Sequence, residues 1–178
     1  MEVKPGYKQT GAGVIPDEWS ADTLGETCAF ENGDRGLNYP SPSSFAPSGV
    51  PFVNAGHLAE GHIDYRAMDY ITKQSYDRLG SGKFQAGDIL FCLRGSLGKF
   101  GVVDVDFGEG AIASSLVIVR PKSIRLSVEY LSCYFGSQLC ARIADSDDAE
   151  HRFRSKPNGV PADGERQFRS MANAARCA

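Results

Sequence analysis

The sequence predicts an α+β fold, in which a mainly antiparallel sheet and a few short helices form one domain over residues 1–144. Two observations favour this prediction. β-rich runs follow one another across glycine-containing turns between residues 87 and 121, and residues 128–143 repeat apolar side chains at helical spacing. A chain of 178 residues is long enough to bury one core of ordinary domain size, so we expect one domain.

The first third of the chain is predicted to contain a short element over residues 23–30, followed by a long loop. Residues 31–49 of that loop are dense in Gly, Pro, Ser and Asn, which are the residues that favour turns. Because long loops in compact domains usually carry function, this segment is a candidate binding loop.

Three short elements are expected after the loop. Residues 51–55 are predicted as a buried strand, and residues 60–65 as a turn with a short strand. Residues 72–79 are predicted as a short helix, with Thr72 as its N-cap and Gly80 as the glycine that follows its C-terminus.

Residues 88–94 and 99–105 are predicted to form a β-hairpin. Each segment is an apolar run of strand length, and the Gly-Ser-Leu-Gly sequence between them supplies the turn. A third β-rich run follows over residues 110–121 and is ended by Pro121. The tip of the predicted hairpin carries the polar side chains of Arg94, Ser96 and Lys99.

Ser127 is the predicted N-cap of the C-terminal helix. The apolar side chains of this helix recur at spacings of three and four and form one stripe, which we interpret as a core face: Val128, Leu131, Phe135, Leu139 and Ile143. Beyond Ala144 no helical or strand period continues, and strongly apolar side chains are few. Residues 145–178 are therefore predicted as a poorly ordered tail.

The net charge of −3 is unfavourable for a polyanionic partner, so a nucleic-acid surface would have to be a local patch. The side chains available for such a patch, which could equally form a solvated mixed surface, are Lys73, Arg78, Lys83, Arg94 and Lys99. No apolar run is long enough to span a membrane and the chain begins with no apolar signal segment, so we expect a cytoplasmic protein without a membrane partner. The five cysteines lack Cys-x-x-Cys spacing and are expected to be reduced core residues.

Catalytic motifs are scarce. The residues around Lys99 do not match a phosphate-binding P-loop, because Leu93 stands where its first glycine belongs and Phe100 where a hydroxyl is needed. The segment containing His57, His62 and Asp64 matches no zinc spacing. A thiol or metal hydrolase built around Cys92 and His57 is retained as one alternative, although Cys92 lies within an apolar strand.

Several segments between residues 6 and 143 form a recognisable order, which begins with "GYKQTGAGVIPDEWSADTLGE" at residues 6–26. It continues through "NGDRGLNYP" and "GVPFVNAGHLAEGHID". "GDIL", followed by "RGSLGK" and then "SSLVIVRP", is the most specific part of the pattern. In this order the segments resemble the specificity subunits of type I restriction-modification systems.

This resemblance implies a target recognition domain with a bent, mainly antiparallel sheet, which reads DNA and performs no catalysis. In that family the domain gives target specificity to a methyltransferase and endonuclease complex. The implied partners are double-stranded DNA, a methylation subunit and a restriction subunit. S-adenosylmethionine and ATP are expected on those partner subunits, and no cofactor or metal is expected in this chain.

On this basis the hairpin tip is expected to approach the duplex. Arg94 and Lys99 would contact phosphate or a guanine edge and Ser96 would donate to the backbone, the alternative being a purely structural turn. The remaining candidates are Asn32, Asp34, Arg35, Asn38 and Tyr39 in the long loop, Asn54 and His57 at a strand end, and Lys73 and Arg78 on the short helix.

The chain departs from the family pattern because it has one recognition domain and no long helix after Ile143. We hypothesise a truncation, caused by a frameshift near residue 145. A weak homodimer that reads a palindromic split site is the form in which half a subunit would work. Two other functions stay open: a module that docks a methyltransferase through residues 128–143 without reading DNA, and an inactive truncated remnant.

Overall fold

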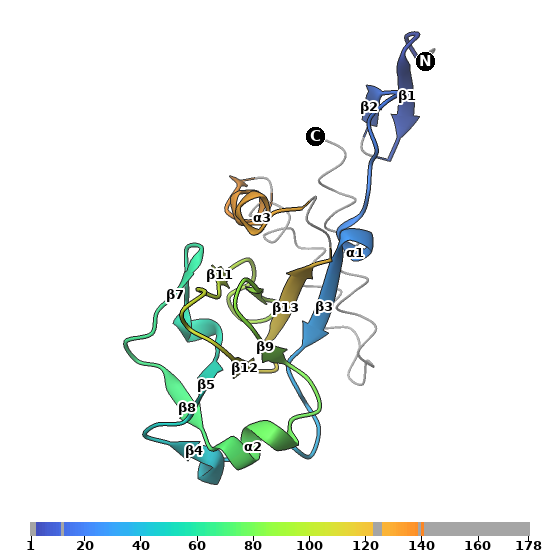
Figure 1. Cartoon of the computed structure of the whole chain (residues 1–178). Coiled ribbons are helices and arrows are strands. Elements are labelled where there is room, and N and C mark those ends of the chain that lie inside the picture. The colour runs from blue at the N-terminus through green and yellow to red at the C-terminus, as the bar shows by residue number, and fades with distance from the viewer. Residues whose placement is uncertain (1–2, 12, 123–125, 139, 141–178) are drawn as a thin grey trace.

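The computed structural model describes residues 3–11, 13–122, 126–138 and 140, and the predicted α+β class is confirmed (Figure 1). Two larger sheets form the centre of the molecule, and most strand pairs in them are antiparallel. The helices are short: α1 (Leu24–Thr27), α2 (Lys73–Arg78) and α3 (Val128–Phe135), with single 3-10 turns at Pro42–Ser44 and Ala55–His57. In the part of the chain that is described, no helix has the length and apolar character needed to cross a membrane.

The first sheet is fully antiparallel and has the strand order β11-β10-β13-β3. Its strands are β3 (Cys28–Asn32), β10 (Ile89–Cys92), β11 (Phe100–Val102) and β13 (Leu116–Pro121). The predicted hairpin is thereby confirmed, because Phe91 of β10 pairs with Phe100 of β11.

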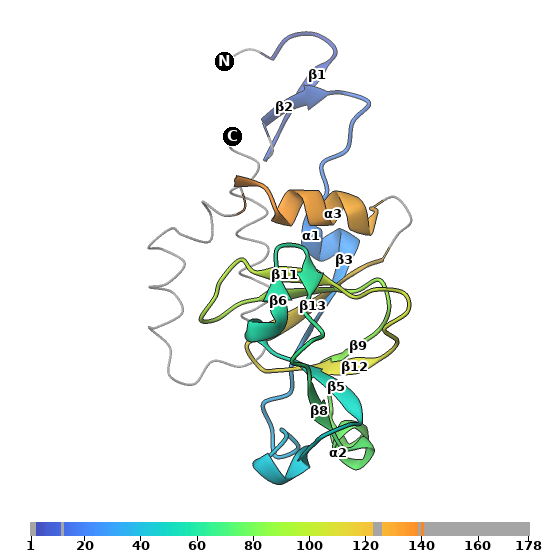
Figure 2. The same ribbon diagram turned by 90° about the vertical axis from the view of Figure 1, so that its left-hand side faces the viewer.

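The second sheet has the order β4-β8-β5-β12-β9, and its β5–β12 pair is parallel. Its strands are β4 (Phe45–Ala46), β5 (Val50–Val53), β8 (Asp69–Ile71), β9 (Lys83–Phe84) and β12 (Gly110–Ile112). A small ribbon of β6 (Leu58–Ala59) and β7 (His62–Ile63) contacts β11. A second ribbon, β1 (Tyr7–Thr10) with β2 (Gly13–Pro16), projects from the end of the molecule opposite α2 (Figures 1 and 2).

The first sheet is buried on both faces, which explains the continuous apolar runs of β10 and β13. Ile89 and Phe91 point to one side, where they pack with Leu131 and Phe135 of α3. Figure 2 shows α3 lying across this side of the first sheet. The alternate residues of β10 point to the other side and pack against residues of the second sheet, among them Val53, Phe84 and Ile112.

The β-rich run predicted over residues 110–121 is confirmed and ends at Pro121, but it contains two strands that belong to different sheets. β12 ends at Ile112, and a turn closed by a bond from the Leu116 N–H to the Ala113 carbonyl (3.0 Å) leads into β13. Gly110 permits the close approach of β12 to β5, because a Cβ there would lie 2.7 Å from the carbonyl oxygen of Pro51. Local patterning can indicate a turn here, but it does not show that the strands on either side of the turn belong to different sheets.

Both predicted N-caps are confirmed. The Thr72 hydroxyl accepts a bond from the Ser75 N–H (3.2 Å), and the Ser127 hydroxyl accepts one from the Tyr130 N–H (3.1 Å). Leu131 is buried as the predicted stripe requires, whereas Leu139, Ile143 and the predicted tail lie outside the described residues.

The role predicted for Gly80 is wrong. Gly80 does not take the left-handed conformation of a C-terminal glycine, which Gly82 adopts instead (φ +79°). The Gly80 N–H donates to the Asp34 carboxylate (2.8 Å), so a side chain distant in sequence determines the backbone path after α2.

The first sheet and the segment before β9 cross at a close backbone contact. Gly33 follows β3 and Gly82 precedes β9, and a Cβ on Gly82 would lie 2.8 Å from the Gly33 Cα. A Cβ on Gly33 would in turn lie 2.9 Å from the carbonyl oxygen of Ile112. The Glu31 carboxylate holds this crossing, because it accepts bonds from the N–H groups of Gly82 (2.6 Å) and Lys83 (3.2 Å).

A buried ion pair joins β13 to the turn before β10. Asp88 is 1% exposed, and the Arg120 guanidinium donates to both of its oxygens at 2.7 and 2.6 Å. Asp88 also accepts a bond from the Gln85 N–H (2.9 Å). The geometry is bidentate, which is the arrangement that best offsets the desolvation of two charges.

We expect Gly33→Ala to destabilise the protein by about 2 kcal/mol, because the added Cβ meets backbone atoms that cannot move aside. Gly80→Ala is the matched control, since a Cβ there would make only an ordinary contact with Asp34 (3.5 Å). Urea unfolding of both variants measures the difference, and equal stabilities would contradict the tight crossing.

We expect Arg120→Met to lower the free energy of unfolding by about 3 kcal/mol, because it leaves the Asp88 carboxylate buried without its counter-charge. The double variant Asp88→Leu with Arg120→Met removes both charges, and its free energy of unfolding should fall by less than that of the single variant. Thermal and urea unfolding compare the two, and a double variant less stable than the single one would refute this account.

Candidate nucleic-acid interface

The loop between β10 and β11 is a compact tip, as the sequence predicts. The Cys92 N–H donates to the Lys99 carbonyl (2.8 Å) and the Gly98 N–H to the Cys92 carbonyl (3.3 Å). Gly95 and Gly98 both have positive φ angles, of +83° and +88°, so glycine is required by the turn itself. Arg94 and Lys99 are exposed, and Ser96 is half-buried.

The long loop after β3 is fixed at its start by side-chain bonds. The Asp34 carboxylate accepts the Gly36 N–H (2.7 Å) and the Gly80 N–H (2.8 Å), and these bonds lower the Asp34 pKa. The next residue, Arg35, donates from Nη2 to the Ser114 carbonyl oxygen (3.0 Å). The loop is therefore anchored on both α2 and the β12–β13 turn.

The hairpin tip and the long loop meet at the β12–β13 turn. The Leu93 N–H, next to Arg94, donates to the Ser115 carbonyl (2.9 Å), while Arg35 bonds to Ser114. Partial burial and the positive charge of Arg94 together lower the Arg35 pKa. Neither arginine has an ion-pair partner within residues 3–11, 13–122, 126–138 and 140. Two uncompensated guanidinium groups from separate segments thus stand near one another, and we call them the arginine pair.

Other loop candidates differ in placement. Asn38 is exposed at the tip of the loop, and Tyr39 is 38% exposed with its ring edge against Phe52 (centroids 6.0 Å apart). Asn32 is not in the loop, because it is the last residue of β3 and pairs with Val117. Asn38 and Tyr39 can reach a ligand in solvent, whereas the backbone of Asn32 belongs to the sheet.

Asn54 and His57 form an internal network. The Asn54 Nδ2 donates to Asp69 (2.9 Å), and its Oδ1 accepts the Gly56 N–H (2.7 Å). The Asn54 N–H donates to His57 Nδ1 (3.1 Å), so the Nε2 of this buried ring carries the proton and lies 3.1 Å from the Ala67 carbonyl oxygen. These contacts give both side chains a structural role.

Lys73 and Arg78 lie on α2. The Lys73 ammonium is 3.2 Å from Asp77 and 3.5 Å from Glu109, and it lies over the Tyr76 ring. Its charge is therefore compensated locally. Arg78 is exposed at the end of α2, two residues before the Gly80 N–H that bonds to Asp34.

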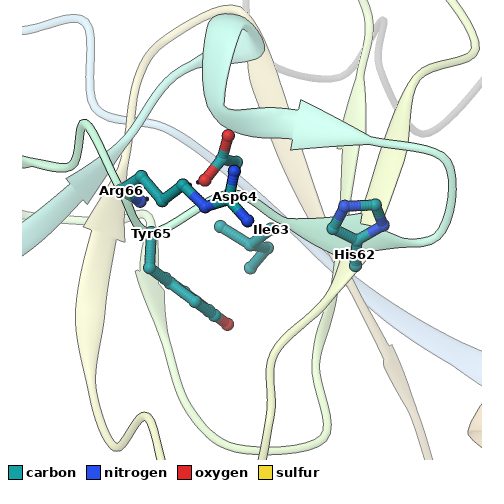
Figure 3. A pocket seen from close by; sticks show the side chains of 5 residues that line it. All are labelled: His62, Ile63, Asp64, Tyr65 and Arg66. Carbon is teal, nitrogen blue, oxygen red and sulfur yellow. Dashed lines mark hydrogen bonds between the residues drawn. The ribbon is translucent and has the colours of Figure 1, made fainter.

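His62 and Asp64 are both exposed and line the same hollow. His62, Ile63, Asp64, Tyr65 and Arg66 line a shallow hollow (Figure 3). Asp64 there accepts the Arg66 N–H (3.0 Å), and no group of three metal-ligating side chains is found in the described chain.

Cys28, Cys92 and Cys140 are buried, as predicted. The prediction of a core residue is wrong for Cys133, which is exposed because it lies on the same face of α3 as the exposed Tyr130, and Cys177 lies outside the described residues.

Cys92 is buried, and its S–H donates to the Arg94 carbonyl oxygen (3.1 Å). The described His57 ring contacts Asn54, Ala67 and Asp69 and is not paired with this thiol. Burial raises the pKa of Cys140 to about 11, which leaves that thiol protonated at neutral pH. A thiol hydrolase centred on Cys92 has no geometric support in this structure.

Sequence reasoning missed the β12–β13 turn as part of the site. Ser114 contacts Arg35 through its backbone carbonyl, which every residue type has, so the residue type does not indicate this contact. The one available hint was the Ala-Ser-Ser sequence between two apolar runs, which is typical of a turn.

We expect Asn54→Ala to lower the free energy of unfolding by about 1 kcal/mol, because a turn cap and the bond to Asp69 are lost. Asn38→Ala is the matched control, since this exposed side chain should change stability by less than about 0.5 kcal/mol. Urea unfolding of both variants measures the difference, and an equal loss would refute the structural role.

Comparisons with known proteins identify a similar fold. No protein-family model and no curated protein sequence matches this chain. Among solved structures, the HsdS subunit from Thermoanaerobacter tengcongensis is similar at 16% sequence identity and a TM-score of 0.53, over 99% of this chain and 46% of that one. A chain from a study of complex assembly and conformational transition of the type I R-M system aligns over the same shares, at 16% identity and a TM-score of 0.46.

The likeness to the first of these structures shows that the chain has the fold of part of an HsdS subunit. The chain spans less than half of that subunit's length. This agrees with the predicted fold of a target recognition domain, which was stated from the order of short segments.

Proposed function

We propose that this chain reads double-stranded DNA and supplies target specificity to a type I restriction-modification complex. The observation that carries the proposal is the arginine pair. Arg35 bonds to Ser114 of the β12–β13 turn, Leu93 beside Arg94 bonds to Ser115, and neither arginine has a carboxylate partner among the described residues. The fold shared with an HsdS subunit supports the same role at the level of the family.

The arginine pair is a favourable binding site for an anion, because both of its side chains are positively charged. Two like charges near one another repel, and the bond from Arg35 to Ser114 keeps one of the two guanidinium groups in place. A phosphate group placed between them would replace that repulsion with two charge-assisted hydrogen bonds. DNA supplies phosphates at regular spacing, and such contacts fix the register of a protein on the duplex.

Sequence would be read by the exposed polar groups beside the arginine pair. Lys99 and Ser96 lie on the same hairpin tip as Arg94, and Asn38 and Tyr39 follow Arg35 on the long loop. Arginine and lysine pair with guanine in the major groove, and asparagine pairs with adenine, so these side chains can distinguish bases.

We further propose that the chain is not catalytic and acts in the cytoplasm with two partner subunits. A methylation subunit would hold S-adenosylmethionine, and a restriction subunit would use ATP. Tyr130 of α3, which is 65% exposed beside Glu129 and Cys133, marks the surface we assign to the methylation subunit. A homodimer would supply the second recognition domain that a split DNA site requires.

A protein-docking module that does not read DNA is the competing function, and the exposed Tyr130 is the observation in its favour. Such a module would bind a methyltransferase with wild-type affinity after the arginine pair is removed. An inactive remnant would bind neither DNA nor a methyltransferase.

We expect duplex DNA binding to weaken steeply as the salt concentration rises, and Arg94→Ala and Lys99→Ala each to reduce the slope of log K against log salt by about 1. Fluorescence anisotropy with a random-sequence duplex pool measures these slopes.

Arg66→Ala and Lys73→Ala are the matched controls and should leave the slope unchanged, since Arg66 lies in the hollow of Figure 3 and Lys73 is already paired with Asp77 and Glu109. Binding that does not depend on salt, or equal effects of all four variants, would overturn the proposed interface.

A further inference from the structure

The long loop presents one leucine entirely to solvent. Leu37 has a relative exposure of 106%, which is the highest among the large apolar side chains that are described. It is the second residue of a β-turn over residues 36–39, which a bond from the Tyr39 N–H to the Gly36 carbonyl (3.1 Å) closes. Leu37 and Asn38 are therefore the two residues at the apex of the turn.

The turn that carries Leu37 is held on both sides. Before it, the Asp34 carboxylate binds the N–H groups of Gly36 (2.7 Å) and Gly80 (2.8 Å). After it, the Tyr39 ring packs edge-on against Phe52, and Pro40 is buried. The loop is thus already ordered in the folded protein. Binding through Leu37 would therefore carry no further entropic cost for ordering the loop.

Leu37 also lies beside the cationic part of the surface. Arg35 precedes it by two residues and is pinned to Ser114, close to Arg94. Tyr39 of the loop and Phe45 of β4, 38% and 41% exposed, place further apolar surface around Phe52 of β5. An apolar tip two residues from an arginine that is held at Ser114 matches a duplex, which offers phosphates outside and apolar base faces between its base pairs.

We infer that Leu37 is a wedge that inserts between two stacked base pairs of the bound duplex and kinks it. The inference rests on the proposed DNA-reading function. It adds a mechanism by which the protein would prefer DNA sites whose base steps unstack easily. The arginine pair holds the backbone while Leu37 replaces the lost stacking contact with its own side chain. Specificity then depends partly on how readily a base step opens, and not on base edges alone.

The test uses the full chain and two duplexes of one sequence, one fully paired and one with a single central mismatch. A mismatched step opens at lower cost, so a wedge binds it more tightly. We expect the wild-type protein to prefer the mismatched duplex, and Leu37→Ala to remove that preference with a loss of about tenfold in affinity for this duplex.

Val105→Ala is the matched control, because Val105 is also highly exposed (81%) but lies in the connection between β11 and β12. This variant should bind like the wild type. A 2-aminopurine beside the mismatch provides a second readout, since its fluorescence rises on unstacking. We expect that rise with the wild type and Val105→Ala, and not with Leu37→Ala.

The outcomes separate the wedge from the function on which it rests. If the wild type binds both duplexes with a steep salt dependence, and Leu37→Ala matches it in affinity and fluorescence, the wedge is refuted and the DNA-reading function stands. If the wild type binds neither duplex at low salt, the proposed function is refuted and the wedge with it. Loss of the mismatch preference in Leu37→Ala alone supports both.

Discussion

The architecture depends on one backbone crossing, at which Gly33 and Gly82 approach too closely for any side chain. The Glu31 carboxylate secures this crossing from one side and the Asp34 carboxylate from the other, since both accept N–H groups from residues 80–83. Two acidic side chains that flank a glycine thus fasten the end of β3 to the segment before β9. Because the crossing also fixes the start of the long loop, Arg35 can reach Ser114.

The residues that stabilise the fold differ from the residues that we propose to contact DNA. The first sheet is buried on both faces, and its strands supply the rigid base of the hairpin tip. The exposed cations stand on turns whose shape is set by glycine and by backbone bonds, not by the cations themselves. Arg94 and Lys99 are therefore free to change in charge or length without loss of the fold. Asn54 and Asp88, by contrast, satisfy buried groups and are part of the scaffold.

Local chemistry explains what could be predicted from the sequence. The caps at Thr72 and Ser127, the β10–β11 hairpin and the exposure of Arg94 all follow from residues near one another in the chain. The division of residues 110–121 between two sheets could not be predicted, because it depends on the pairing of β12 with β5 and of β13 with β3, whose residues lie far apart in the chain. The proximity of Arg35 to Arg94 could not be predicted either, because it depends on the bond from Arg35 to the backbone carbonyl of Ser114.

The pairing of β3 has a consequence for biosynthesis. This strand is an edge of its sheet, and its partner is β13, which begins at Leu116. During translation β3 leaves the ribosome long before that partner, so its backbone N–H and C=O groups stay open to water or to other nascent chains for most of synthesis. The first sheet can close only late, and contacts so distant in sequence make folding slow. The longer the ribosome takes to synthesise the residues between β3 and β13, the longer the nascent chain should depend on chaperones.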